Sequence, residues 1–461
     1  MKVFCLLTAI LFSQAASSQT LSSRLGKALA ELEQMPMFRH AQVSMYVLDA
    51  QTGKPVFARS EKSGMVPASV QKLVTSASAY ALLGPGYRFR TRFAVIPSEI
   101  AENPPLLVLE PGVDPVLGSD RFPSQPDFMD QLIKYLQIRG IKSLSGILIR
   151  DQDFDPNPIP DGWIWQDIGN YFGAGAWPLN WQENKTRVSF STGKTVGEPA
   201  RLLQPHGYER YRIIQEVKAG PAGSGDQAFV YAFPFGHTVM LKGTVPAGQQ
   251  RFDVFGSIPD PARFFADSLA RRAAKSGIRL GEGLYYASGQ AIQPVIPVDS
   301  FAVYRSPDWE EVNNWFMKKS INLYGEAVVK AISYQAGQRA ATDSGIFVIR
   351  KFWEQQGIPL ASMRILDGSG LSPSNRISAE ALVSVLSFAR RQKWFTGFYQ
   401  SLPEINGIKM KDGYITGVRT YAGYIRSQNG QDYIFAFMVN NADGSPSVIR
   451  QKMWAVLDVL K

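Results

Sequence analysis

Cysteine is almost absent from this sequence. The 461-residue chain holds a single cysteine, Cys5, and it lies close to the N-terminus. A chain without further cysteines has no disulfide framework, no thiol nucleophile and no cysteine ligand for a metal. Its stability must therefore come from hydrophobic cores, and the 45% content of hydrophobic residues is sufficient for them.

Histidine is nearly as scarce, and no zinc-peptidase motif of the His-Glu-x-x-His kind occurs. Ser369, in the run 367–370, lacks the leading glycine of a hydrolase nucleophile elbow. We therefore expect neither a Ser-His-Asp hydrolase nor a zinc peptidase, and no metal or organic cofactor. The three histidines, none in a setting typical of catalysis, are His40, His206 and His237.

The first residues have the pattern of a secretory signal. Met1 and Lys2 give a positive start, residues 3–12 are apolar, and residues 14–18 form a mostly small-residue stretch that a signal peptidase can cut. No later apolar run reaches the length of a membrane span. The sequence predicts a signal peptide at residues 1–18 and an exported protein, either periplasmic or associated with the cell wall.

The charge of the chain is strongly positive. A net charge of +10 and a pI near 9.4 favour anionic partners. Export argues against nucleic acid, so an anionic membrane face or a cell-wall polymer is the better candidate for a peripheral contact. A positive surface that only keeps the protein soluble explains the charge equally well.

The two ends of the chain share one pattern, helices flanking strands. Helical spacing predicts a helix from Leu21 to Leu32, a second helix from Ala68 to Leu83 and a closing helix over residues 453–460. Alternation predicts a hairpin at residues 43–58 and strands at 407–411, 421–427 and 433–440. We expect an α/β domain with an antiparallel sheet flanked by helices, built from residues 19–89 and 259–461.

The middle of the chain, residues 90–258, has a different texture. It is rich in proline, glycine and aromatics, with short strand-like runs and one helix-like stretch at 128–138. The length of the whole chain also exceeds one ordinary core. We therefore expect one or two inserted, mostly β domains here. The aromatic stretch 163–181 either lines a glycan groove or, as such residues more often do, forms a loop-rich core.

Ser69 and Lys72 form the first candidate constellation. A spacing of three places both on one face of the predicted helix, with the hydroxyl in reach of the amine. A buried lysine can lose its proton and serve as the base that a serine nucleophile needs. The signal is weak alone, because Ser191 and Lys194 have the same spacing. Glycine and strand-like neighbours argue against a helix there.

Two further segments gain meaning from their order behind the first. In Ser320-Ile321-Asn322, a second hydroxyl can relay a proton and the amide can hold a substrate carbonyl. In Lys411-Asp412-Gly413, the lysine supplies positive charge, and the glycine lets a substrate backbone approach the strand edge. Taken singly, a turn or capping role is the default for each, as it is for Asp49, Asp114 and Asp367.

Together the segments resemble the serine penicillin-binding proteins. The resemblance is closer still to the D-alanyl-D-alanine carboxypeptidase/endopeptidase family of low-mass penicillin-binding proteins, peptidase family S13. It runs from about residue 20 to the C-terminus and is carried by residues 67–75, 319–324, 367–372 and 421–424, with Gly112-Val113-Asp114-Pro115-Val116-Leu117 in place of an insert motif.

The resemblance implies a serine β-lactamase/transpeptidase-like domain interrupted by a large insert. It also implies roles for the site residues. Ser69 is acylated, Lys72 activates it, and Ser320 relays protons. Asn322 binds the substrate amide, while Lys411 polarises Ser320 and attracts the peptide carboxylate. Gly413 lies at the strand edge, and the backbone N–H groups of Ser69 and Tyr414 form an oxyanion hole. The implied partners are peptidoglycan stem peptides as substrates and β-lactams as covalent inhibitors.

Asp412 departs from the family pattern, which has threonine or serine there. A carboxylate repels the terminal carboxylate of D-Ala-D-Ala unless Lys409, Lys411 or Arg419 pairs with it. It would favour a substrate whose carboxylate is already an amide, as in cross-link cleavage. The alternative is a silent or weak peptidoglycan-binding protein, against which all five other motif residues argue. A β-lactamase fits less well, because of the insert and the 367–372 segment.

Overall fold

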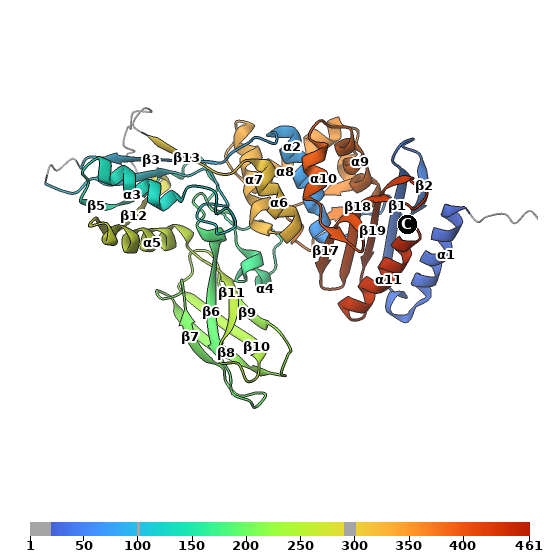
Figure 1. Ribbon diagram of the computed structural model, residues 1–461, viewed down its shortest axis with the longest axis horizontal. Coiled ribbons are helices and arrows are strands. Elements are labelled where there is room, and N and C mark those ends of the chain that lie inside the picture. Colours follow the sequence, from blue (N-terminus) through green and yellow to red (C-terminus); the bar gives the residue numbers. More distant parts are fainter. Residues whose placement is uncertain (1–19, 99–101, 290–300) are drawn as a thin grey trace, which may run out of the picture.

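The central sheet joins the two ends of the chain. The structure, a computed structural model, describes residues 20–98, 102–289 and 301–461. The strands of this sheet are β1 (Gln42–Asp49), β2 (Pro55–Arg59), β16 (Glu404–Ile405), β17 (Ile408–Ile415), β18 (Val418–Arg426) and β19 (Asp432–Asn440). Their order is β16-β17-β18-β19-β1-β2, and all neighbours are antiparallel (Figure 1). The predicted antiparallel sheet from both chain ends is confirmed.

Helices cover both faces of this sheet. On one face lie α1 (Leu21–Gln34) and α11 (Pro446–Asp458), and on the other lie α2 (Lys72–Leu82) and α9 (Ala379–Arg390). Strand β19 serves both cores, because successive side chains of a strand point to opposite faces. Phe435 and Phe437 pack with α1 and α11, whereas Ala436 and Met438 belong to the core beneath α9.

The remaining helices of this part surround α2. They are α6 (Trp309–Lys319), α7 (Asn322–Gln335), α8 (Thr342–Gln355) and α10 (Phe395–Ser401), with a short strand pair β14 (Met363–Arg364) and β15 (Arg376–Ile377). Helix α7 is buried along nearly its whole length and contacts α2, α6 and α8. The helix is central although it carries polar residues, among them Asn322, Glu326 and Lys330, which are buried as well.

A second hydrophobic core underlies a five-stranded mixed sheet. Its strands are β3 (Arg90–Ile96), β4 (Leu106–Glu110), β5 (Ser143–Ile149), β12 (Arg279–Tyr286) and β13 (Ala302–Arg305), in the order β12-β5-β4-β3-β13. Two helices, α3 (Phe128–Ile138) and α5 (Pro261–Lys275), pack on it. Helix α3 has the predicted bounds.

The boundary predicted at residue 258 separates α5 from the core on which it packs. Phe265 of α5 contacts Phe128 of α3 with ring centroids 5.9 Å apart, and Leu269 is buried in the same cluster. Strands β12 and β13 also belong to this sheet. A boundary near residue 305 keeps the second core whole, and the inserted part then includes the helices α3 and α5 as well as strands.

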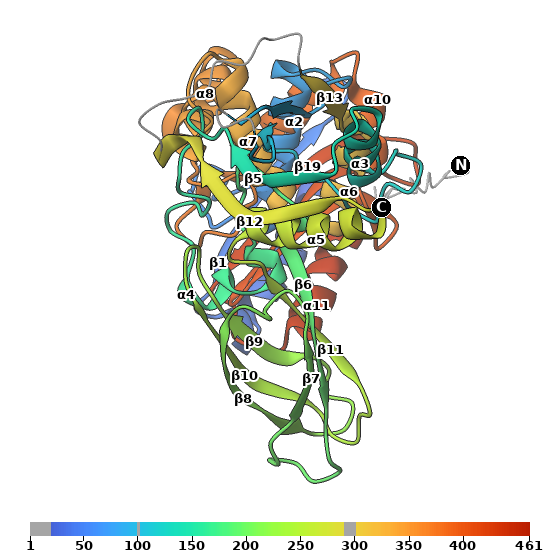
Figure 2. The same ribbon diagram turned by 90° about the vertical axis from the view of Figure 1, so that its left-hand side faces the viewer.

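A third, all-strand part projects from the molecule (Figures 1 and 2). It consists of two three-stranded sheets. One contains β6 (Lys185–Ser191), β7 (Arg201–Pro205) and β11 (Phe252–Ser257), and the other contains β8 (Arg212–Gly220), β9 (Gln227–Tyr231) and β10 (Thr238–Pro246). The short helix α4 (Trp165–Ile168) contacts β9 at its upper end.

Among the described residues, no helix has both the length and the apolar character needed to cross a membrane. The predicted signal peptide at residues 1–18 lies outside the described residues.

Candidate functional site

Ser69 lies in a short turn that leads into α2. Residues Ala68–Gln71 form a 3₁₀ turn, and the α-helix begins only at Lys72, four residues later than predicted. The preceding Ala68 has a φ of 46°, a left-handed conformation that is rare for a residue other than glycine. Strained backbone of this kind concentrates at functional sites, where the surrounding structure holds it in place.

The amine of Lys72 is the centre of the site. Nζ lies 3.0 Å from Oγ of Ser69, 2.6 Å from Oδ1 of Asn322 and 2.7 Å from the backbone oxygen of Ser369. The side chain is fully buried. Burial, followed by the charge of Lys411, lowers the pKa of Lys72 to about 7. A lysine that loses its proton near neutrality can accept the proton of the Ser69 hydroxyl.

Asn322 is engaged on both sides of its amide. While Oδ1 accepts from Lys72, Nδ2 donates to the backbone oxygen of Phe172 at 2.7 Å. Asn322 is the first residue of α7, and Phe172 lies in the 3₁₀ turn Tyr171–Gly173 of the inserted part. One of the two N–H groups of this amide is thus paired with a carbonyl of the protein.

Ser320 lies between α6 and α7 in a left-handed conformation, with φ 55° and ψ 39°. It is the C-terminal cap of α6, and its side chain is partly exposed. Within the described ranges, its hydroxyl has no hydrogen-bond partner. The conformation places Ser320 at the junction of the two helices, and no hydrogen bond between the described residues joins its hydroxyl to Ser69, Lys72 or Lys411.

The buried Lys411 and the partly exposed Asp412 form an ion pair on β17. Nζ of Lys411 donates to the backbone oxygen of Asp412 at 2.8 Å and to its Oδ1 at 3.2 Å. A guanidinium nitrogen of Arg419 lies 3.5 Å from Oδ2. Burial lowers the pKa of Lys411. Burial alone would raise the pKa of Asp412, but Lys411 and Arg419 hold it below its ordinary value.

Two of the three pairing candidates for Asp412 are therefore found. Lys409 instead lies 3.9 Å from Glu404. The carboxylate of Asp412 stays ionised at neutral pH, because the cations Lys411 and Arg419 both lie beside it.

Gly413 is packed directly beneath the nucleophile. A Cβ at this position would lie 2.8 Å from the backbone nitrogen of Ser69, 2.8 Å from the backbone oxygen of Pro67 and 2.3 Å from Oγ1 of Thr420. Only glycine lets β17 come this close. The next residue, Tyr414, is half exposed, and its ring faces the guanidinium of Arg419 at 4.9 Å.

Asp367 is a buried carboxylate that holds the loop next to Lys72 in place. The sequence patterns predicted only a turn role for it. Its Oδ1 accepts from Gln71 at 2.7 Å and from Asn375 at 2.9 Å, and its Oδ2 accepts from the indole of Trp163 at 2.9 Å. Backbone N–H groups of residues 370 and 372 complete the set. The carboxylate thereby fixes the loop whose Ser369 oxygen contacts Lys72.

Glu326 is a second buried carboxyl, and no sequence motif marked it as a candidate site residue. Its Oε2 accepts from the backbone of Gly368 at 2.9 Å, while Oε1 has no partner among the described residues. Burial raises its pKa to about 8, with Asp367 adding to the effect. The group is therefore mostly protonated at neutral pH. Its place on α7, one turn after Asn322, is the only sequence feature that connects it with the site.

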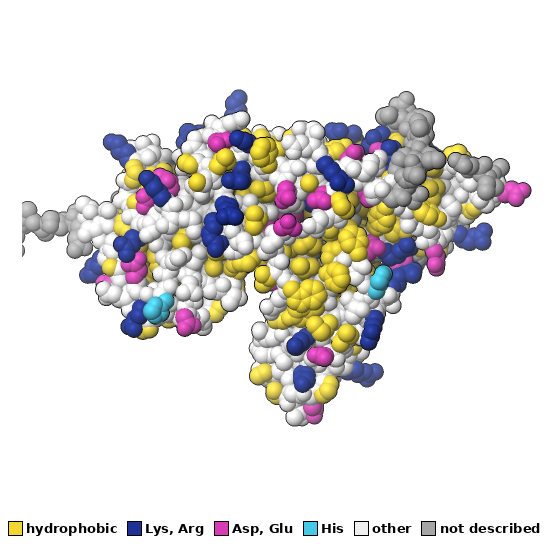
Figure 3. All heavy atoms as spheres, turned by 180° about the vertical axis from the view of Figure 1, so that it is seen from behind, with side chains coloured by type: hydrophobic (Ala, Val, Ile, Leu, Met, Phe, Trp, Pro, Cys, Tyr) yellow, Lys and Arg dark blue, Asp and Glu magenta, His cyan; other side chains and the backbone are white. Residues whose placement is uncertain are grey.

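The aromatic stretch 163–181 divides into two roles. Trp163, Trp177 and Trp181 are buried, as a core requires, whereas Trp165 and Tyr171 are each more than half exposed. Apolar side chains gather over the projecting part near its junction with the rest of the molecule (Figure 3). The exposed rings therefore add to an apolar surface close to Phe172.

Comparison with known proteins agrees in both sequence and structure. The family model of the D-Ala-D-Ala carboxypeptidase 3 (S13) family matches residues 25–460. A D-alanyl-D-alanine carboxypeptidase of Actinomadura sp. (strain R39) is 25% identical over 477 aligned residues, covering 94% of this chain and 85% of that protein. The D-alanyl-D-alanine carboxypeptidase DacB of Haemophilus influenzae is 22% identical and covers 82% and 80%.

The crystal structure of penicillin binding protein 4 from Haemophilus influenzae has the same fold. Its TM-score is 0.78 at 18% identity, with 93% of this chain and 99% of that chain covered. A second structure of that protein, complexed with a β-lactam, has a TM-score of 0.71. The match extends over the inserted parts as well as the domain that carries Ser69.

Proposed function

Because the chain belongs to the D-Ala-D-Ala carboxypeptidase 3 (S13) family, we propose that Ser69 is its nucleophile and that Lys72 is the base that activates it. The chain is a serine-type D-Ala-D-Ala carboxypeptidase/endopeptidase. The observation that carries the residue assignment is the 3.0 Å distance from Nζ of Lys72 to Oγ of Ser69, at a lysine whose pKa burial and Lys411 lower to about 7.

Acylation begins with a proton transfer inside this pair. Neutral Lys72 takes the proton of the Ser69 hydroxyl while Oγ attacks the carbonyl carbon of the scissile D-Ala bond. The negative charge that develops on the carbonyl oxygen is held by the backbone N–H groups of Ser69 and Tyr414. The close approach of Gly413 to the nitrogen of Ser69 supports this pairing of donors, since it brings β17 beside the nucleophile turn.

Collapse of the tetrahedral species expels the amine, which needs a proton. Ser320 relays it from the lysine to the leaving nitrogen, and Lys411 polarises the Ser320 hydroxyl. The acyl-enzyme then holds the D-Ala carbonyl as an ester of Ser69. Attack by water, with Lys72 again as base, releases the shortened peptide and restores the serine.

Asn322 has a second donor for the substrate. One N–H of its Nδ2 donates to the backbone oxygen of Phe172, and the amide nitrogen carries a second N–H. The proposed role of this second N–H is to donate to a substrate amide carbonyl while the bond to Phe172 is kept.

The negative charge of Asp412 favours substrates in which the residue that leaves has no free carboxylate. The cations Lys411 and Arg419, which would attract a peptide carboxylate, already hold Asp412. A second carboxylate at about 4 Å would be repelled by about 1 kcal/mol in water and by several kcal/mol at lower dielectric. Cross-linked or amidated peptides avoid this repulsion, so we expect endopeptidase action to exceed carboxypeptidase action.

The proposed substrates are peptidoglycan stem peptides, and the proposed covalent inhibitors are β-lactams. The solved structure of penicillin binding protein 4 from Haemophilus influenzae in complex with a β-lactam supports the second assignment. Action on the cell wall in turn places the proposed site of action outside the cytoplasm, in the periplasm or at the wall.

The test is to incubate the purified protein with a labelled penicillin and to map the adduct by mass spectrometry. We expect one adduct, on the peptide that contains Ser69, and none in the Ser69→Ala variant. Ser191→Ala is the matched control, because Ser191 has the same spacing to a lysine but lies on β6 in the projecting part. It should be acylated like the wild type.

An adduct elsewhere would contradict the nucleophile assignment. No adduct in the wild type, with one gained in Asp412→Thr, would mean that Asp412 excludes β-lactam carboxylates. No adduct in either protein would favour a silent peptidoglycan-binding protein.

A further inference from the structure

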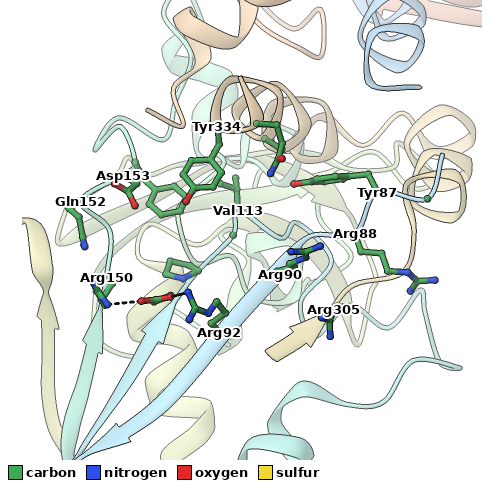
Figure 4. Close-up of a pocket in the computed structure, with 17 residues that line it drawn as sticks. Tyr87, Arg88, Arg90, Arg92, Val113, Arg150, Gln152, Asp153, Arg305 and Tyr334 are labelled. Atoms are coloured by element: carbon green, nitrogen blue, oxygen red, sulfur yellow. Dashed lines mark hydrogen bonds and ion pairs between the residues drawn. The ribbon is translucent and has the colours of Figure 1, made fainter. Parts of the chain in front are cut away.

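A cavity of about 550 Å³ lies away from Ser69, between the five-stranded sheet and the far end of α7. It is lined by the ends of β3, β5 and β13, by the chain after α2, and by the last residues of α7. Figure 4 shows Tyr334 and Tyr87 above the cavity and arginine side chains around it. The cavity thus lies where the inserted part meets the domain that carries the nucleophile.

Arginine dominates the polar lining of this cavity. Only two carboxylates, those of Glu110 and Asp153, line it together with five arginines. Glu110 serves two arginines, with 2.6 Å to Arg150 and 2.8 Å to Arg92. The arginines are Arg88, Arg90, Arg92, Arg150 and Arg305. The positive charge of the lining therefore exceeds its negative charge.

Arg90 and Arg305 are the least compensated members. They lie directly opposite each other in the antiparallel pair of β3 and β13. Like charges directly opposite in a sheet are destabilising. Neither side chain has an ion-pair partner within the described ranges, whereas Arg88 donates to the backbone oxygen of Ser306 at 2.9 Å and lies 3.4 Å from Asp308. Figure 4 shows these three arginines on one side of the cavity, apart from Arg92 and Arg150.

The opposite wall is aromatic. Phe154 and Tyr334 are stacked, with ring centroids 6.3 Å apart and an interplanar angle of 7°. Tyr87 is partly buried at the same edge, and burial raises its pKa to about 12, so its hydroxyl remains a donor. A ligand that fits both walls has an anionic group at one end and a ring or carbon skeleton behind it.

We propose that this cavity binds a phosphate ester, with the phosphoryl group held by Arg88, Arg90 and Arg305 and its organic part against Tyr334. Three planar guanidinium groups supply more donors than one carboxylate can accept, whereas the terminal oxygens of a phosphate monoester match them. The ligand compensates the opposed pair of Arg90 and Arg305 and connects the inserted part with α7.

The site is separate from the catalytic one. Asn322 and Tyr334 lie at opposite ends of α7, and the rise of the helix puts them roughly 18 Å apart. The ligand is therefore an additional partner and not the scissile peptide. Its source is a soluble sugar or polyol phosphate, a polymer that carries phosphate, or a lipid phosphate headgroup.

The test measures binding of glucose 6-phosphate to the whole protein by calorimetry. We expect one site, weakened by added salt because the contact is ionic. The double variant Arg90→Gln/Arg305→Gln should bind at least about tenfold more weakly, since each charge-assisted contact contributes a substantial part of the affinity. Arg201→Gln/Arg212→Gln is the matched control, since both are exposed strand arginines of the projecting part.

Penicillin acylation of Ser69 serves as the test of folding for every variant. Equal binding by the double variant and the wild type, or no binding by the folded wild type, would overturn the proposal. Binding of glucuronate as tightly as of glucose 6-phosphate would overturn the phosphate assignment. Vesicles of phosphatidylcholine with and without phosphatidic acid distinguish the sources. Sedimentation of the wild-type protein with the acidic vesicles alone, and loss of that sedimentation in the double variant, identifies a lipid phosphate. If the wild-type protein does not sediment with them, the ligand is a soluble or polymer-borne ester.

Discussion

The side chain of Asn322 donates a hydrogen bond to the backbone carbonyl oxygen of Phe172, with 2.7 Å between Nδ2 and the oxygen. The same amide accepts a hydrogen bond from Lys72 through Oδ1 at 2.6 Å. One residue thus connects the base of the site with a loop of the inserted part. A change in charge at position 322 would therefore act directly on the amine of Lys72.

Replacing Asn322 by aspartate is expected to move the pH dependence of acylation upward. A carboxylate next to Nζ favours the charged lysine and raises the pKa of Lys72 above about 7. Each unit of that rise leaves about tenfold less neutral base at neutral pH. The rate of penicillin acylation, followed from about pH 5 to about pH 9, should therefore be lower and should level off at higher pH. Asn322→Ala should slow acylation without that upward shift, and an unshifted profile for Asn322→Asp would contradict the role of Lys72 as base.

Substitution of Asp412 is expected to change substrate preference more than overall activity. In Asp412→Asn the repulsion of a substrate carboxylate is removed while the shape is kept, and in Asp412→Thr a hydroxyl donor is added. A peptide ending in D-Ala-D-Ala should gain about tenfold or more in kcat/KM over the wild type, whereas its C-terminal amide should change little. Comparing the acid and the amide in all three proteins measures the effect. A wild type that already prefers the free acid would show that Asp412 does not repel it.

The Gly413→Ala variant is expected to be acylated more slowly although its sheet remains folded. Its Cβ would meet the backbone at Pro67 and Ser69, which moves β17 away from the nucleophile turn. We expect the rate of acylation to fall by about a hundredfold, the range seen when an oxyanion donor is lost. Gly26→Ala is the control, because its Cβ meets only Phe57 at 3.8 Å within α1. That change should leave acylation intact and stabilise the helix by roughly 0.5–1 kcal/mol.

The Glu326→Gln variant is expected to be more stable than the wild type at alkaline pH. Burial raises the pKa of Glu326 from 4.5 to about 8 in the folded protein. The stability that the protonated carboxyl contributes is full below about pH 4.5 and is lost as the pH rises through about 8. Glutamine does not titrate, so its advantage should grow over this interval to roughly 1–3 kcal/mol.

Urea unfolding at both ends of this pH interval measures the difference. Glu31, an exposed residue of α1, provides the control in Glu31→Gln, for which we expect no such change with pH. An advantage of glutamine that is the same at both pH values would show that Glu326 does not titrate in this range.

Local spacing predicts the parts of the site that are close in sequence. Ser69 and Lys72 are three residues apart on one helical start, so their contact follows from helix geometry. Neither the left-handed Ala68 nor the 3₁₀ turn that precedes the regular helix at Lys72 was predictable in this way. The contact of Lys72 with Ser369 and that of Asn322 with Phe172 could not be predicted either. Both acceptors are backbone oxygens of residues distant in sequence, and no side-chain pattern marks them.

The limits of the fold prediction have the same origin. The apolar stripe of α5 shows that one face is buried, but periodicity does not reveal which sheet covers it. Phe265 packs on α3, so the helix belongs with the five-stranded sheet, whose strands come both before and after it in the sequence, and not with the central sheet. The strands of the central sheet were predictable because their alternation and turns are local, whereas the pairing of β1 with β19 joins residues nearly 400 positions apart.

Helix α7 makes hydrogen bonds along its length to the loop segment 157–183, through Asn322, Tyr324 and Lys330. The indole of Trp163 adds a bond to the buried Asp367. The inserted part therefore cannot be removed without leaving buried polar groups of the catalytic part unpaired. An engineered minimal enzyme without it would leave Tyr324 and Lys330 without these hydrogen-bond partners in the interior, and Asp367 would lose the bond from Trp163. Miniaturisation of this scaffold would therefore first require apolar replacements for Tyr324 and Lys330.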